Sequence, residues 1–91
     1  MNRQWSARFT KQVQRLFQGN PHLMNPVEKT MHYLWRFPPA HPALRMKRIH
    51  GITGIYECSV NMDIRVTFEF VDPETILLRN IDHHDRALLR Y

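Results

Sequence analysis

The chain has 91 residues, of which 43% are hydrophobic, so we expect one domain over residues 1–91 with a single modest core rather than a disordered polypeptide. A formal net charge of +5, with a pI of about 10.0, favours a polyanionic partner, either nucleic acid or an acidic protein. A single cysteine excludes an intramolecular disulfide, and no apolar run has the length of a membrane span or of a signal-peptide core, which together favour a cytoplasmic protein that binds no membrane.

Two amphipathic helices are predicted in the first part of the chain. The first covers about Ser6 to Gln18, where apolar side chains recur at helical spacing until Gly19-Asn20-Pro21 ends the pattern. The second is predicted to begin with Asn25 as its N-cap and Pro26 at its first helical position, and to end at Pro38-Pro39. Its apolar stripe, which we expect to pack in the core, consists of Val27, Met31, Leu34 and Trp35.

A basic segment over residues 41–50 follows the helices and predicts a loop and then a short strand with exposed cations. Three further strands are predicted over about 54–60, 64–71 and 75–81, joined by turns at 61–63 and 72–74. Two helices followed by such a meander predict an α+β domain, with the helices packed on one face of an antiparallel sheet.

The turn at 61–63 sets the register of the first predicted hairpin. A three-residue loop pairs Ser59 with Arg65 and Cys58 with Val66, and the alternation of side chains then assigns every residue to one of two faces. Tyr56, Cys58, Val60, Ile64, Val66 and Phe68 form the apolar face, so Cys58 is expected to be a packed, inert thiol. Glu57, Ser59, Arg65, Thr67 and Glu69 form the polar face. That polar face is either an ordinary solvated surface or a surface on which Arg65 binds phosphate.

Three segments of the chain together carry a family resemblance. The first is the basic segment His41-Pro-Ala-Leu-Arg45-Met-Lys47-Arg48-Ile-His-Gly51, the second the hairpin Ile55-Tyr-Glu-Cys-Ser-Val-Asn61 with Ile64-Arg65-Val-Thr-Phe, and the third Ile76-Leu-Leu-Arg79-Asn-Ile-Asp-His83-His84-Asp85. In this order they resemble the RelE/ParE toxin superfamily of bacterial toxin–antitoxin systems, and the likeness spans nearly the whole chain.

The resemblance implies a RelE-like fold, with a short first strand, two helices, and an antiparallel sheet curved around a substrate groove. In the branch that does not poison gyrase, it implies an endoribonuclease that cleaves messenger RNA in the ribosomal A site without a metal or cofactor. It also implies a cognate antitoxin, acidic or amphipathic, as the inhibitory partner, and contact with operator DNA only through the toxin–antitoxin complex.

The resemblance also assigns roles to single residues. Arg65 falls on the family's transition-state arginine, and His84 on the acid/base or phosphate-binding residue of the last strand. His41 lies close to where some members place a general base, and Tyr91 near the terminal aromatic that stacks on a base or positions the 2′-hydroxyl. The RNA-binding candidates are Arg45, Lys47, Arg48, Ser59 and His83. Imidazoles suit proton transfer near neutral pH, and a guanidinium can hold two phosphate oxygens.

The run Asp82-His83-His84-Asp85 also invites comparison with a metal site. Neighbouring residues on a strand point to opposite faces, so four consecutive ligands do not converge easily on one ion, and we expect no metal here. Asp82 replaces a frequent Gly, and Cys58 and Ser59 stand where several branches carry Arg or Lys, which weakens the electrostatic case for catalysis. Two alternatives to an endonuclease therefore stay open: a gyrase-inhibiting toxin, against which His84 argues, and a degenerate relative that only binds protein or DNA.

Overall fold

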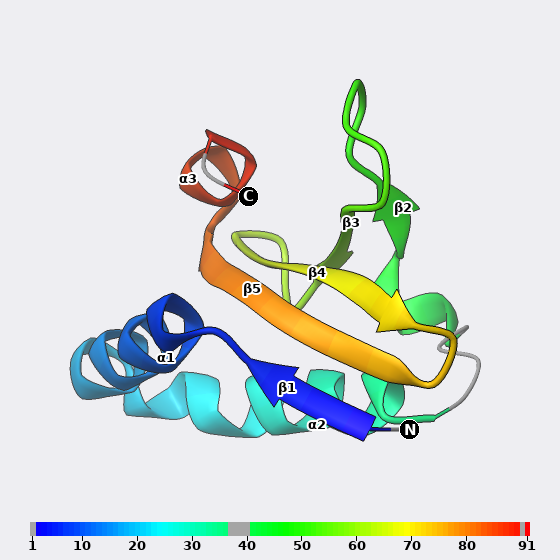
Figure 1. Cartoon of the computed structure of the whole chain (residues 1–91). Helices are drawn as coiled ribbons and strands as arrows, with labels where there is room; N and C mark the ends of the chain where they lie inside the picture. Colours follow the sequence, from blue (N-terminus) through cyan, green and yellow to red (C-terminus); the bar gives the residue numbers. More distant parts are fainter. Residues whose placement is uncertain (1, 37–40, 90) are drawn as a thin grey trace.

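The computed structural model describes residues 2–36, 41–89 and 91, which form a five-stranded sheet with α-helices on both of its faces (Figure 1). The sheet order is β1-β5-β4-β3-β2, in which β1 runs parallel to β5 and the other pairs are antiparallel. The strands are β1 (Asn2–Trp5), β2 (Lys47–Arg48), β3 (Tyr56–Ser59), β4 (Ile64–Asp72) and β5 (Thr75–His83), and the α-helices are α1 (Ala7–Gly19), α2 (Met24–Leu34) and α3 (His84–Leu89). The predicted α+β class is confirmed.

Helix α1 begins one residue later than predicted, after Ser6. The Ser6 Oγ accepts a hydrogen bond from the Phe9 amide at 3.0 Å and donates one to the Arg79 carbonyl at 2.8 Å. One side chain thus satisfies an orphan amide of the helix and fixes the helix start to β5.

The predicted start of α2 is wrong. A 3-10 turn over Pro21–Leu23 leads directly into the helix, so Leu23 is the N-cap residue and makes no side-chain capping bond, while Asn25 is already helical. Pro26 lies in the first turn, where a missing amide proton costs no hydrogen bond. The apolar stripe packs as expected, with Val27 and Leu34 buried and Met31 and Trp35 against the core. The predicted end at Pro38-Pro39 lies outside the described residues.

The register predicted for the first hairpin is confirmed. Ser59 pairs with Arg65, Cys58 with Val66 and Glu57 with Thr67, and a bond from the Val60 amide to the Ile64 carbonyl closes the turn. The apolar face packs on α1 and α2, where the side chains of Cys58, Ile64, Val66 and Phe68 are fully buried. This agreement places Arg65 on the opposite face, away from the main core.

That opposite face is not a solvated surface throughout, as the alternation suggested. Glu57 and Thr67 are both buried. Helix α3, which the sequence reading did not contain, lies over this face, on the other side of the sheet from α1 and α2 (Figure 1). Asn80, buried on β5 and paired with Thr67, donates a hydrogen bond to the Ala87 carbonyl of α3 at 3.2 Å. The covered part of the face is therefore the region around Thr67 and Asn80.

The last strand also departs from the prediction. It continues to His83, and His84 is the first residue of α3 rather than the end of a strand.

Among the helices of the described residues, none has the length and apolarity needed to cross a bilayer.

Candidate functional site

Three polar residues form a row across one end of the sheet, two of them predicted site residues and the third their neighbour on β5. Ser59 on β3 pairs with Arg65 on β4, and Arg65 pairs with Asp82 on β5. Because directly paired residues share a face, these three side chains lie on the same side as the buried Glu57–Thr67 pair. All three are half-buried. The row therefore lies on the face that α3 covers elsewhere, and its three residues stay partly exposed.

The guanidinium of Arg65 is held near the β3–β4 turn. Its Nη1 donates to the Asn61 carbonyl at 2.6 Å and to the Ile64 carbonyl at 3.2 Å. The Asn61 side chain in turn accepts from the Asp63 and Ile64 amides, each at 2.8 Å, so the turn itself is well fixed. Only one guanidinium nitrogen is used in these bonds, which leaves the other donors of the fork directed elsewhere.

His83 and His84 lie at the same end of the sheet as Arg65. His83 pairs with Ile64, and the His84 amide donates to the Asp63 carbonyl at 2.7 Å. The His84 Nδ1 atom lies 3.3 Å from Asp85 Oδ1, and the His84 side chain is 48% exposed. Over the residues that the structure describes, no group of three or more His, Cys, Asp or Glu could hold a metal ion.

The basic segment borders the row at the other edge of the sheet. Strand β2 pairs with β3, and Lys47 Nζ lies 3.4 Å from Glu57 Oε1, so an exposed ammonium neutralises a buried carboxylate. Arg48 lies over the Tyr56 ring, 6.0 Å from its centroid, and Arg45 adopts a left-handed backbone conformation with φ 48°. All three cations are exposed. They form a positive border to the sheet, with only Lys47 paired to a carboxylate within it.

His41 is placed on a different part of the molecule. It precedes a 3-10 turn over Pro42–Leu44, and its Nδ1 accepts a hydrogen bond from the Ala43 amide at 3.1 Å. Its ring stacks on Tyr33 of α2 with centroids 3.7 Å apart. Tyr33 lines a hollow of about 480 Å³ that also reaches Ser59 and Asn61. Ser59 is therefore the point at which the surroundings of His41 approach the Arg65 row.

Tyr91 returns to the middle of β5 rather than to the strand end where His84 lies. Its carbonyl oxygen accepts a hydrogen bond from Arg79 Nε at 2.8 Å, and Arg79 Nη1 lies 3.4 Å from Glu69 Oε1. The structure thus places Ser59, Arg65, His83 and His84 at one end of the sheet, with His83 paired to Ile64 outside the row, and it places His41 and Tyr91 at two separate points.

Cys58 is buried next to this row but faces the core. Burial raises the pKa of its thiol to about 12, with a further increase from the Glu57 carboxylate and an opposing effect from Arg65. The thiol is therefore protonated at neutral pH, as expected of an inert cysteine, and the expectation that Cys58 is packed is confirmed.

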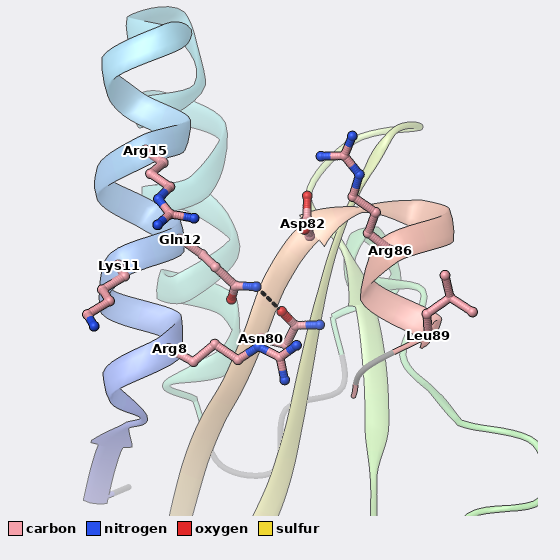
Figure 2. Close-up of a pocket in the computed structure, with 8 residues that line it drawn as sticks. All are labelled: Arg8, Lys11, Gln12, Arg15, Asn80, Asp82, Arg86 and Leu89. Carbon is pink, nitrogen blue, oxygen red and sulfur yellow. Dashed lines mark hydrogen bonds between the residues drawn. The ribbon is translucent and has the colours of Figure 1, made fainter.

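A basic groove between α1 and α3 was not predicted from the sequence. The groove has a volume of about 640 Å³, with α1 forming one wall, α3 the other and β5 the floor (Figure 2). Its lining residues, called the α1–α3 groove below, are Arg8, Lys11, Gln12, Arg15, Asn80, Asp82, Arg86 and Leu89. The signal in the sequence was the spacing of Arg8, Lys11 and Arg15, which places three cations along one side of a helix.

Comparison with solved structures finds bacterial toxins of similar fold. In the E. coli DinJ–YafQ complex, the matched chain has 16% identity and a TM-score of 0.79, with 93% of this chain and 94% of that chain covered. A metal-bound toxin from Helicobacter pylori has 18% identity and a TM-score of 0.79, with 94% of this chain and 97% of that chain covered. The YoeB dimer from Staphylococcus aureus has 17% identity and a TM-score of 0.71, with 92% of this chain and 97% of that chain covered. No protein-family model matches the sequence, and no curated protein matches it. The chain therefore has the RelE-like toxin fold that the sequence resemblance implied.

Proposed function

We propose that this protein is the toxin of a type II toxin–antitoxin system and that it cleaves messenger RNA on the ribosome. The observation that carries this proposal is the position of Arg65 and His84 at one end of the sheet. The His84 amide donates to the Asp63 carbonyl, and Asp63 is two residues from Arg65, so the backbone positions that carry a cation and an imidazole meet at this end of the sheet. These are two of the groups that metal-free cleavage of a phosphodiester requires.

In the proposed reaction, the 2′-hydroxyl attacks the adjacent phosphorus and the bond to the 5′-oxygen breaks. The Arg65 guanidinium stabilises the charge on the pentacoordinate phosphorus, and His84 donates a proton to the departing 5′-oxygen. A base must remove the 2′-hydroxyl proton, and His41 is the candidate carried over from the family resemblance, while Tyr91 is carried over as the aromatic that stacks on a base or positions the 2′-hydroxyl. The exposed cations Arg45, Lys47 and Arg48, with Ser59 and His83, would bind the RNA on either side.

An antitoxin is the proposed protein partner. The toxin fold and the DinJ–YafQ complex among the similar structures support this assignment. A net charge of +5 suits an acidic or amphipathic antitoxin segment, and operator DNA would be contacted only through the complex. Such a system also places the toxin in the cytoplasm, where the ribosome is its target.

The test is a cell-free translation reaction with a defined messenger RNA and increasing amounts of the protein. We expect cuts at fixed positions within codons, mapped by primer extension, and no cuts in the same RNA without ribosomes. Messenger RNA that stays intact at a large excess of folded protein would overturn the proposal.

A second candidate function is a toxin relative that acts through binding alone. The pairing of Asp82 with Arg65 favours this alternative, because a carboxylate beside the proposed phosphate site opposes the binding of an anion. A structure named YoeB/ParE toxin, from Agrobacterium tumefaciens, is also similar in fold, so a gyrase target belongs to the same test. Expression that causes gyrase-linked DNA breaks would favour the gyrase-inhibiting toxin. Expression that leaves growth unchanged would favour the relative that acts through binding alone.

A further inference from the structure

We propose that the α1–α3 groove binds the phosphate backbone of an RNA strand, outside the surface where cleavage would occur. Four of its eight lining side chains are cations, Arg8, Lys11, Arg15 and Arg86, and the only carboxylate is Asp82. Arg8 and Arg15 extend from α1 toward β5, and Arg86 stands on the opposite wall (Figure 2). A nucleic-acid backbone is the ligand that needs a line of cations and hydrogen-bond donors without base-specific contacts.

The placement of these cations opposes the stability of α1. The helix carries three cations and no acidic residue. Lys11 and Arg15 are four residues apart, a spacing at which like charges repel, and Arg8 lies in the first turn, where the helix dipole disfavours positive charge. Packing alone gives no reason for the placement of Lys11 and Arg15, since both residues are exposed. A bound polyanion removes the repulsion.

The floor of the groove is fixed by hydrogen bonds between all three elements. Gln12 of α1 donates from Nε2 to Asn80 Oδ1 and accepts from the Ile81 amide at 2.9 Å. Asn80 donates to the Ala87 carbonyl of α3 at 3.2 Å. The two walls are therefore held at a set separation by a hydrogen-bond network before any ligand binds, which lowers the cost of ordering the site.

The composition of the groove favours nucleic acid over an acidic peptide. Amphipathic helices that dock in grooves rely on apolar anchors, and Leu89 is the single apolar side chain among the lining residues. The groove also continues the candidate site, because Asp82 lines it and is paired with Arg65. A strand that leaves the Arg65 surface over β5 therefore enters the groove. In this respect the inference rests on the proposed function, for which it supplies a second contact with the same RNA.

The test measures binding without cleavage. A fluorescent 2′-O-methyl RNA of about 20 nucleotides, which lacks the attacking 2′-hydroxyl, is titrated with protein at several salt concentrations, and a DNA strand of the same sequence is titrated in parallel. The variants are Arg15→Gln and Arg86→Gln, one from each wall, singly and together. The matched control is Arg3→Gln with Arg36→Gln, since neither residue lines the groove. Both double variants reduce the net charge from +5 by two, to +3.

We expect each groove substitution to reduce the slope of log affinity against log salt by about 0.7, and the double variant to reduce it by about 1.4. RNA affinity of the groove double variant should fall about tenfold at ~0.1 M salt, against a change of less than about twofold in the control. DNA binding reduced as strongly as RNA binding would still assign the groove to the phosphate backbone. Equal losses in the two double variants would show an effect of net charge only and would overturn the inference.

Two further results keep the inference separate from the proposed function. RNA binding by the groove in a protein that cleaves no messenger RNA would support the groove and refute the cleavage. Loss of binding to an acidic peptide such as oligoglutamate, with RNA affinity unchanged in the groove double variant, would overturn the inference in favour of a protein partner.

Discussion

Gln12 on α1 hydrogen-bonds to both the side chain of Asn80 and the backbone next to it, and so closes the part of β5 that β1 does not reach. Strand β1 pairs only with residues 75–78 of β5, which leaves the edge of the strand beyond Leu78 open. The Gln12 Oε1 atom accepts from the Ile81 amide at 2.9 Å, and its Nε2 donates to Asn80 Oδ1. The Gln12 side chain thereby supplies hydrogen bonds that a neighbouring strand would otherwise make at this sheet edge.

The first prediction follows from this arrangement. Asn80→Ala should lower the free energy of unfolding by about 2–3 kcal/mol, because it removes a buried amide and leaves Gln12 Nε2 and the Ala87 carbonyl without this partner. Urea denaturation followed by circular dichroism measures the change. The control is Gln14→Ala, at an exposed position of α1, the helix that carries Gln12. It should shift the free energy of unfolding by less than about 0.5 kcal/mol. An equal loss of stability in Asn80→Ala and Gln14→Ala would show that the Gln12–Asn80 contact does not stabilise the fold.

Asn80 also shows where sequence reasoning ends. Strict alternation along β5 would put Ile76, Leu78 and Asn80 on one face. The pairing shifts between Thr67–Asn80 and Phe68–Leu78, so Arg79 is an extra residue on β5. The shift turns Asn80 toward α3 and places Ile81 in the core. A bulge of this kind depends on both strands at once, so a pattern read along one strand does not contain it.

The predictable part of the fold was that determined by local patterns. The α1 stripe and the turn at 61–63 encode α1 and the first hairpin, and with them the face on which Arg65 lies. Helix α3 is six residues long and has Ala87 as its single buried residue, too little for a helical period to show in the sequence. The placement of His84 and the α1–α3 groove both depend on α3, which explains why neither was foreseen.

Thr67→Val should stabilise the protein. The Thr67 Oγ1 atom is buried without a hydrogen-bond partner among the residues that the structure describes, and valine has nearly the same shape without the hydroxyl. We expect the free energy of unfolding to rise by about 1 kcal/mol. Thermal melting measures the change, with Thr10→Val, an exposed position, as the control. A loss of stability at position 67 would mean that the hydroxyl has a partner under α3.

Cys58 should make stability fall at alkaline pH. Its pKa is raised from 9.0 to about 12 in the folded protein, so the unfolded chain loses the thiol proton first as pH rises. The stabilising contribution is complete below pH 9 and is lost between about pH 9 and pH 12, at up to ~1.4 kcal/mol for each pH unit. Urea denaturation of wild type and Cys58→Ala at several pH values measures it. Parallel curves for the two proteins would contradict this assignment, since all other titrating groups are shared.

Arg65→Ala should abolish messenger RNA cleavage and preserve the fold. A charge-assisted contact to the developing phosphorane is worth on the order of 3 kcal/mol, or ~100-fold in rate. The side chain is half-buried, and its hydrogen bonds to described residues go to backbone carbonyls of the turn, so the melting temperature should fall by no more than a few degrees. Arg36→Ala, at an exposed position beyond α2, is the matched loss of one cation. Full cleavage activity in folded Arg65→Ala would remove this residue from the mechanism.

His84→Ala and His83→Ala together test the proposed proton donor. Both residues are exposed and adjacent, so each variant removes one imidazole from the same end of the sheet. His84 begins α3 and its fold-supporting bond comes from its backbone amide, which alanine keeps. His84→Ala should therefore melt within a few degrees of wild type, retain antitoxin binding, and cleave messenger RNA at least about 100-fold more slowly. His83→Ala should retain most of the cleavage activity, because His83 ends β5 beside Ile64 and not beside the Arg65 row. Cleavage rates in the cell-free translation reaction decide the matter. Equal activity in the two variants would exclude the histidine pair from catalysis and favour the binding-only alternative, whereas loss in His83→Ala alone would transfer the proton-donor role to His83.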